Sequence, residues 1–199
     1  MPATADLARL WADYLALYQN GPHWPTDDQL HSLAYFREET KLGRTTSSTA
    51  SRSRVSVWVD AVIAVEAFVD REGRLPRENN RAARESITVE ERRLADWIRY
   101  QRRYTTRDRH CEYQRRRLEC VPGFSWDPRG DQWDVQFAEF ARFVATHHRA
   151  PRYRSDDSHE KGLAAWAAKQ RELIQKGTLS PRRVKKLRSL SFRITGPAK

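Results

Sequence analysis

The sequence has few of the features that mark secreted, disulfide-bonded or membrane proteins. Its 199 residues include two cysteines, Cys111 and Cys120, whose spacing fits no C-x-x-C motif. The N-terminus carries acidic residues and no apolar signal segment, which together with the low cysteine content indicates a reducing cytoplasm. No apolar run approaches the roughly 20 residues of a membrane-spanning helix. We therefore expect a cytoplasmic protein with no membrane partner.

Motifs that carry catalysis or bind cofactors are also missing. The chain contains no Gly-x-x-x-x-Gly-Lys-Ser/Thr phosphate loop, no Gly-x-Ser-x-Gly and no His-Glu-x-x-His. The histidines include no i,i+4 pair, and no cysteine cluster accompanies them, so no metal site is expected. These absences predict a protein without catalytic activity, cofactor or small-molecule substrate.

Positive charge is what the chain has in excess. Lys and Arg number 37 against 26 Asp and Glu, for a formal net charge of +11. Such a balance favours polyanions, nucleic acid first, through Coulombic attraction and counterion release. Thirty of the basic residues are arginine, which suits bidentate phosphate and guanine contacts. A GC-rich genome would enrich arginine in the same way, so composition alone does not identify the partner.

The chain contains an internal repeat. When the sequence is aligned with itself, a shift of 75 residues matches the first part of the two copies and a shift of 69 residues matches the second part. The aligned segments are Trp58 with Trp133, Phe68-Val69 with Phe143-Val144, Arg74-Leu-Pro-Arg77 with Arg149-Ala-Pro-Arg152, and Leu94-Ala-x-Trp97-x-x-x-Gln101-Arg102 with Leu163-Ala-x-Trp166-x-x-x-Gln170-Arg171. A six-residue insertion between 78 and 91 explains the change of shift. A third, weaker copy opens the chain, aligned by a shift of 51.

Each copy is predicted to form three helices, because its apolar residues recur with a period of 3.6. Gly177 ends one helix of the last copy, and Ser180 and Pro181 supply the cap and first residue of the next. Asp131 is the expected cap of the first helix in that copy. The other expected helices are 56–71, 90–105 and 108–119 in the middle copy, 161–176 and 181–190 in the last, and 45–55 in the first.

No sustained strand alternation occurs, so the expected fold class is all-α. We expect tandem three-helix units, two clear repeats plus a degenerate N-terminal copy. The expected domains are 1–54, 55–128 and 129–199.

The two clear copies share a set of residues that resembles the helicase-associated domain, a short three-helix repeat found in tandem in actinobacterial and phage proteins. The matching residues are Trp133, Pro151, Gly162-Leu-x-x-Trp166, Gln170-Arg171, Gly177-x-Leu179-Ser-Pro and Leu187 in the last copy, and Trp58, Pro76, Leu94-x-x-Trp97, Gln101-Arg102, Leu118 and Val121-Pro-Gly-Phe-x-Trp126 in the middle copy. The middle copy departs from the family by lacking the Gly-x-Leu turn before its third helix. The resemblance covers about 140 residues and implies a nucleic-acid-binding module.

The positive charge is concentrated in the last copy. Residues 129–199 hold 16 Lys/Arg and seven Asp/Glu, a net +9, whereas residues 55–128 carry +2 and residues 1–54 are neutral. The expected nucleic-acid contacts are Arg182, Arg183, Lys185, Lys186 and Arg188 on the third helix, with Lys169, Arg171, Lys176, Arg102, Arg115, Arg116 and Arg117 in support. The alternative is that the basic helix is an ordinary solvated face.

Aromatic and glutamine residues of the repeat suggest core positions. Trp58, Trp97, Trp133 and Trp166 recur at apolar-face positions and are expected in the cores. Trp24 and Tyr153 fall in expected loops and are candidates for base stacking. The Gln101-Arg102 and Gln170-Arg171 pairs lie at the rim of the core face. They either brace the repeat or point toward phosphate.

The sequence therefore predicts a non-catalytic protein that binds nucleic acid, with double-stranded DNA favoured over RNA. Its basic third helices would contact phosphates and a groove. The alternative is a protein-interaction module, for instance a phage or mobile-element factor that binds or inhibits a host protein. The neutral N-terminal copy favours a protein partner at that end of the chain.

Overall fold

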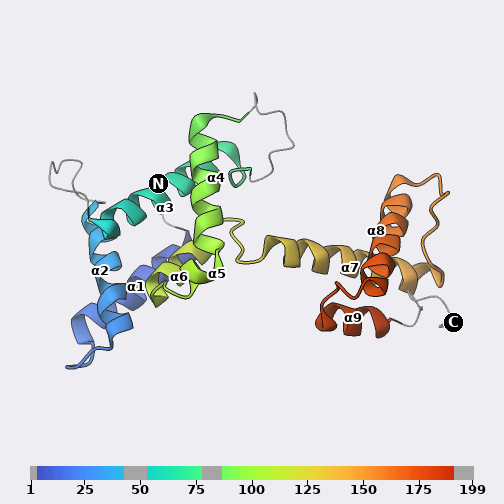
Figure 1. Cartoon of the computed structure of the whole chain (residues 1–199). Helices are drawn as coiled ribbons and strands as arrows, with labels where there is room; N and C mark the ends of the chain where they lie inside the picture. Colours follow the sequence, from blue (N-terminus) through green and yellow to red (C-terminus); the bar gives the residue numbers. More distant parts are fainter. Residues whose placement is uncertain (1–3, 43–52, 78–86, 191–199) are drawn as a thin grey trace. The chain divides into compact units, whose positions relative to one another are not determined.

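The computed structural model describes residues 4–42, 53–77 and 87–190, and all of their regular secondary structure is helical (Figure 1). This confirms the all-α fold class. The chain divides into two compact units, residues 1–126 (unit 1) and 127–199 (unit 2). The expected first and second domains thus form one unit, and the expected boundary near 128 lies close to the observed one.

Unit 1 contains α1 (Ala5–Asn20), α2 (Asp27–Leu42), α3 (Arg54–Glu72), α4 (Val89–Arg102), α5 (Tyr104–Arg107) and α6 (Glu112–Glu119). Helices α3, α4 and α6 are the three that the middle copy predicts. The expected helix 90–105 ends earlier, because the chain turns at Arg103 and starts the short α5. The expected helix 108–119 begins later, because Cys111 is its N-cap. Most of the helix expected over 45–55 lies outside the described residues.

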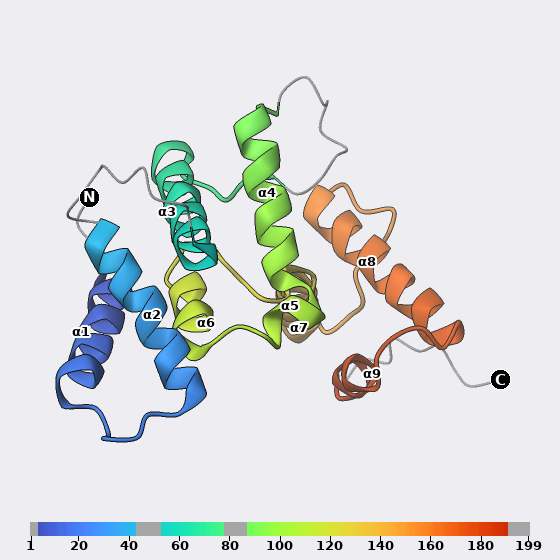
Figure 2. The same cartoon turned by 60° about the vertical axis from the view of Figure 1, so that its left-hand side comes forward.

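The first two helices of unit 1 lie side by side, and α2 packs on both α3 and α6 (Figure 2). Tyr113 of α6 contacts Tyr14 of α1 edge-on, with a ring-centroid distance of 4.9 Å, and also contacts Phe36 of α2. One apolar core therefore joins α1, α2 and α6, and a second joins α3, α4 and α6. Because α6 belongs to both cores, α1 and α2 pack in one unit with the helices of the middle copy.

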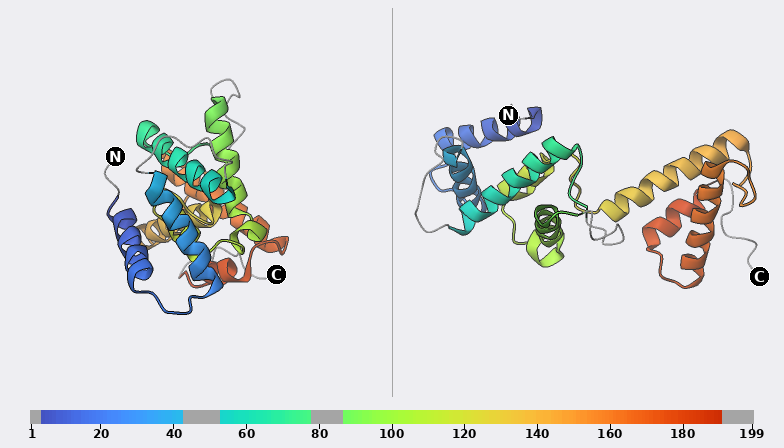
Figure 3. Two further views of the ribbon diagram at one scale, coloured as in Figure 1. Left: turned by 90° about the vertical axis from the view of Figure 1, so that its left-hand side faces the viewer. Right: turned by 90° about the horizontal axis from the view of Figure 1, so that it is seen from above.

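Unit 2 contains α7 (Pro128–His147), α8 (Ser158–Gln175) and α9 (Pro181–Arg188). Helix α8 packs across α7, and α9 follows at the C-terminal end of α8 (Figure 3). The prediction that Asp131 caps α7 is wrong. The carboxylate of Asp127 accepts the Gly130 N–H at 2.9 Å, and Pro128 occupies the first helical position. Proline is pre-set for that position, so the helix starts earlier than expected.

The two units repeat the same side-chain contacts. The Trp58 indole N–H donates to Gln101 Oε1 at 3.1 Å, and the Trp133 indole N–H donates to Gln170 Oε1 at 2.9 Å. Both glutamines are buried. A buried N–H needs an acceptor, so each glutamine holds its helix to the tryptophan of the preceding one. The open question about the two glutamines is thereby answered: they brace the repeat.

Candidate nucleic-acid interface

Helix α9 has one side in the core of unit 2 and one side in solvent. Leu187 is 2% exposed and packs with Val184 against α7 and α8 residues of the core. The hydroxyl of Ser180 caps the helix by accepting the Arg183 N–H at 3.5 Å. The buried side fixes the orientation of the helix, and the opposite side presents its cations.

Three of those cations are open to solvent. Arg182, Lys185 and Arg188 are exposed, and none forms an ion pair with another described residue. They follow each other at intervals of three, so neighbouring members lie close together on the helix surface. We call them the α9 cation stripe.

The other two basic residues of α9 are held by the protein itself. The Arg183 guanidinium lies over the Trp133 ring at 4.9 Å from its centroid. The Lys186 ammonium lies 5.9 Å from the same ring and pairs with Asp134 at 2.7 Å. Both side chains are half-buried. The cation–π contacts and the ion pair thus draw these two predicted nucleic-acid contacts onto α7.

The predicted contacts on α8 also fall into two groups, those with an ion pair inside the protein and one without. Lys169 and Lys176 both pair with Glu172, at 2.9 Å and 2.6 Å, and these hydrogen bonds lower the pKa of Glu172 to about 2. Arg171 is exposed and has no ion pair within the described residues. Exposed pairs of this kind are weak, so the two lysines remain within reach of a competing phosphate.

The predicted contacts of unit 1 are engaged inside that unit. Arg102 donates to the Ser125 carbonyl at 2.5 Å and lies over the Phe124 ring. Arg115 donates to the His110 carbonyl at 2.5 Å, and Arg116 pairs with Asp13. The structure does not gather these three into an outward-facing set.

Arg117 is wrong as a nucleic-acid contact, because it is completely buried. Its Nε donates to Glu39 of α2 at 2.8 Å, and its Nη1 donates to Glu66 of α3 at 2.7 Å. The Tyr113 hydroxyl donates to the same Glu39 at 2.6 Å. Arg117 thus links three helices of unit 1, and it is inaccessible to an external phosphate.

The aromatic residues fall largely where the repeat places them. Trp58 and Trp133 are buried, and Trp97 and Trp166 pack half-buried against the same cores, which confirms the core prediction. Among the loop candidates, Trp24 is 84% exposed and Tyr153 is 72% exposed. Both remain candidates for base stacking.

The loop between α7 and α8 is organised by Glu160, a residue that was not among the predicted site residues. Its carboxylate accepts hydrogen bonds from Arg149, from the Arg152 backbone N–H at 2.7 Å and from the Ser155 hydroxyl at 2.9 Å. In unit 1, Glu91 accepts from Arg74 and from the Arg77 N–H at 3.0 Å. The two glutamates align under the shift of 69, and this match in the repeat could have identified Glu160 from the sequence.

The hydrogen bond from Arg149, helped by those from Arg152 and Ser155, lowers the pKa of Glu160 to about 2. An unfolded glutamate titrates near pH ~4.3. The stabilisation is therefore complete above the unfolded pKa and is lost as pH falls toward 2. We expect the difference in melting temperature between wild type and Glu160→Gln to be largest near pH 6 and to shrink steadily below pH 4.3. Thermal melts followed by NMR signals of unit 2 measure this.

An Asp156→Asn variant is the control for this pH dependence, because Asp156 is an exposed residue of the same loop. Its melting temperature should follow that of the wild type across the pH range. A Glu160→Gln difference that stays constant between pH 6 and pH 2 would contradict the ion pair as the source of loop stability.

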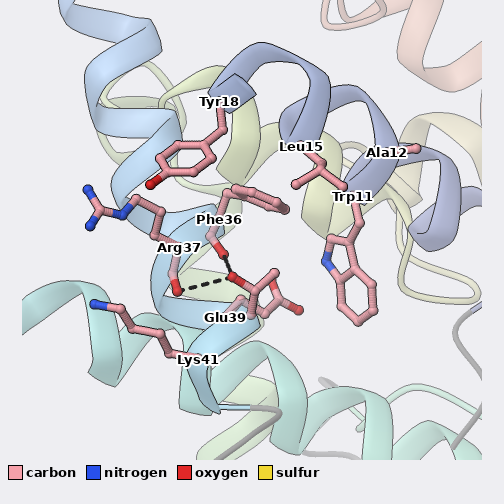
Figure 4. A pocket seen from close by; sticks show the side chains of 9 residues that line it. Trp11, Ala12, Leu15, Tyr18, Phe36, Arg37, Glu39 and Lys41 are labelled. Carbon is pink, nitrogen blue, oxygen red and sulfur yellow. Dashed lines mark hydrogen bonds between the residues drawn. The ribbon is translucent and has the colours of Figure 1, made fainter. Parts of the chain in front are cut away.

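A groove of about 670 Å³ lies between α1 and α2 of unit 1. Figure 4 shows Trp11, Leu15 and Tyr18 of α1 beside Phe36 of α2. Leu15 is 46% exposed and Tyr18 is 55% exposed, so the groove offers apolar surface to solvent. The Thr40 hydroxyl, which also lines the groove, donates to the Phe36 carbonyl at 3.0 Å.

Within residues 4–42, 53–77 and 87–190, no three metal-ligating side chains gather in one place. The helices of that same part of the chain include none with the length and hydrophobicity needed to cross a membrane.

The geometry of unit 2 defines a small helical module whose third helix is basic on its outer side. Residues 130–195 match the family described as the helicase associated domain, which confirms the resemblance for this unit. Comparison with curated proteins and with solved structures found no match to the chain.

Proposed function

We propose that this protein binds nucleic acid without catalysing a reaction, with double-stranded DNA preferred over RNA. The observation that carries the proposal is the α9 cation stripe of Arg182, Lys185 and Arg188. Within the described residues the side chains of these three cations form no hydrogen bond or ion pair, and the buried side of the helix fixes the face on which they lie.

The dimensions of the stripe suit a phosphate backbone. Consecutive members of the stripe are three residues apart. At a rise of 1.5 Å per residue they are separated by about 4.5 Å along the helix axis, so the stripe spans about 9 Å. Duplex DNA carries one charge per ~1.7 Å of its axis, so several phosphates lie within reach. Phosphate contacts of this type position a protein on a duplex and contribute most of the salt-dependent affinity.

The corresponding helix of unit 1 lacks such a stripe. Under the shift of 69, Arg182, Lys185 and Arg188 correspond to Tyr113, Arg116 and Glu119. Tyr113 is buried, Arg116 pairs with Asp13, and Glu119 is acidic. The proposed interface therefore lies on α9 and not on α6.

Replacing Arg182, Lys185 and Arg188 together by glutamine should weaken binding to duplex DNA by at least about tenfold at low salt. The plot of log affinity against log salt should also flatten by about 0.9 for each phosphate that the variant no longer neutralises. The fold should survive, because Leu187, Val184 and the cap are unchanged. Fluorescence anisotropy of a labelled duplex across a salt series measures both effects.

The matched control removes the same charge elsewhere, by changing Arg9, Arg92 and Arg93 to glutamine. These residues are exposed on α1 and α4 and have no ion pair within the described residues. If the control loses as much affinity as the α9 variant, net charge and not α9 is responsible. A duplex RNA probe bound more tightly than DNA would reverse the proposed preference.

A second candidate function is binding of a protein partner at the N-terminal end of unit 1. The groove between α1 and α2, with its exposed Leu15 and Tyr18, favours it, because an apolar groove accepts an apolar helix face. This candidate takes precedence if the wild type binds no nucleic acid at low salt.

A further inference from the structure

We infer that unit 1 carries a nucleotide-binding cavity, separate from the α9 cation stripe, in which an unpaired base lies among aromatic rings and its phosphate meets arginines. The cavity has a volume of about 760 Å³ and is formed by residues of α2, α3, α4, α5 and α6. This volume is within the range of about 300–1,000 Å³ for small-molecule sites. The inference does not depend on duplex binding by α9.

Four aromatic side chains line the cavity: Tyr35, Trp58, Trp97 and Tyr100. Tyr35 meets Trp58 edge-on at a centroid distance of 5.3 Å, and Trp97 meets Trp58 at 5.9 Å. Tyr100 is 52% exposed, and the Arg103 guanidinium lies over one face of its ring at 5.6 Å from the centroid. Aromatic faces stack on any base, because every base has a π-face.

The charged residues of the lining are all positive. They are Arg54, Arg103 and Arg109, and no aspartate or glutamate is among the lining residues. None of the three arginines pairs with an acid in the described part of the chain. Such a rim attracts an anion and repels a cation, which excludes the ammonium ligands that aromatic cages otherwise bind.

The inner side of the cavity is polar and neutral. Gln101 Oε1 accepts from the Trp58 indole and lies 2.8 Å from Nε2 of His110, while the Gln114 side chain accepts the Cys111 N–H at 3.2 Å. Burial lowers the pKa of His110 and so favours the uncharged imidazole. Neutral amides and an imidazole suit the polar edge of a base.

A comparison of the two repeat copies shows that, among the described residues, the tryptophan of unit 1 lacks the covering cation found in unit 2. Under the shift of 69, Gln114 corresponds to Arg183, whose guanidinium covers the Trp133 ring of unit 2. Unit 2 thus covers its tryptophan with its own cation. Unit 1 has the shorter, neutral glutamine at that position, and the open cavity lies beside it.

The test uses 2-aminopurine, a fluorescent base whose emission is quenched when it stacks on an aromatic ring. The full chain is titrated into 2-aminopurine nucleoside monophosphate and, separately, into a single-stranded oligonucleotide with one 2-aminopurine. To separate this site from α9, the protein carries the Arg182, Lys185 and Arg188 to glutamine changes. Quenching by the monophosphate identifies a free nucleotide as ligand. Quenching by the oligonucleotide alone identifies an unpaired nucleotide within a strand.

The deciding variants are Tyr100→Ala and the double change Arg103→Gln with Arg109→Gln. Each should weaken binding by about tenfold and reduce the quenching. The double change Arg92→Gln with Arg93→Gln removes the same charge from α4 outside the cavity and should bind like its parent. The inference is overturned if neither probe is quenched, or if the cavity variants bind like the Arg92 and Arg93 control. Neither result bears on duplex binding by α9, which is measured with α9 intact.

Discussion

Replacing Arg117 by glutamine should lower the free energy of unfolding of unit 1 by about 3–5 kcal/mol. The side chain is completely buried and pairs with Glu39 and Glu66, and Glu39 is itself only 4% exposed. The substitution leaves a buried carboxylate without its counter-charge, which costs more than the ion pair contributes when intact. It also removes the link between α6, α2 and α3. Hydrogen exchange measured by mass spectrometry reports the stability of each unit separately.

The repeat provides the matched control for this prediction. Lys186 is the residue of unit 2 that corresponds to Arg117 under the shift of 69. It is half-exposed and pairs with the half-exposed Asp134, so Lys186→Gln should change stability by about 1 kcal/mol or less. Equal effects of the two substitutions would contradict the burial of Arg117 beneath α2.

A double-mutant cycle tests the ion pair itself. Glu39→Gln combined with Arg117→Gln should cost less than the sum of the single changes, because the second substitution removes the charge that the first left unpaired. Additive effects would mean that the two side chains do not interact.

Replacing Trp133 by alanine should destabilise unit 2 by about 3–5 kcal/mol, as truncation of a buried aromatic does. Trp133 is 7% exposed and stacks on Phe137 at a centroid distance of 5.3 Å. Its indole N–H is the hydrogen-bond partner of the buried Gln170, and its ring carries Arg183. The change therefore leaves a cavity in the core and also removes the ring on which Arg183 of α9 lies.

Two further substitutions separate these contributions. Trp133→Phe keeps most of the ring and loses the N–H, so it should cost about 1–3 kcal/mol through the unpaired Gln170. Trp24→Ala removes a tryptophan that is 84% exposed and should leave stability unchanged. Hydrogen exchange in α7 and α8 measures the two Trp133 variants, and exchange in α1 and α2 measures Trp24→Ala. If Trp133→Ala is as stable as Trp24→Ala, then Trp133 is not part of the core.

The helices and cores of this protein could be predicted from the sequence, because both depend on local periodicity and on the repeat. Apolar residues at helical spacing placed Trp58 and Trp133 in the cores, where the structure has them. The prediction that Ser180 and Pro181 supply the cap and first residue of the last helix is confirmed. The start of α7 was predicted wrongly at Asp131, because helical periodicity locates the buried face of a helix and not its first residue.

The state of each cation was decided only by the tertiary structure. Arg117 and Lys186 occupy corresponding positions on basic helices, yet one is buried between two glutamates and the other is half-exposed beside Asp134. The difference comes from α2, which covers α6 in unit 1. Net charge and spacing along a helix do not predict which acid pairs with a given arginine, because the partner is up to 78 residues away in the sequence.

The sequence by itself thus determined an all-α chain with a repeated three-helix pattern and a basic C-terminal end, since composition and periodicity are properties of the chain. Tertiary structure decided which cations are available to a ligand. Packing turned Arg117 into a structural residue, drew Arg183 and Lys186 onto Trp133, and left Arg182, Lys185 and Arg188 facing solvent. The physical reason is that a charge is neutralised by what lies next to it in space, and those neighbours are set by the packing of helices that are distant in the chain.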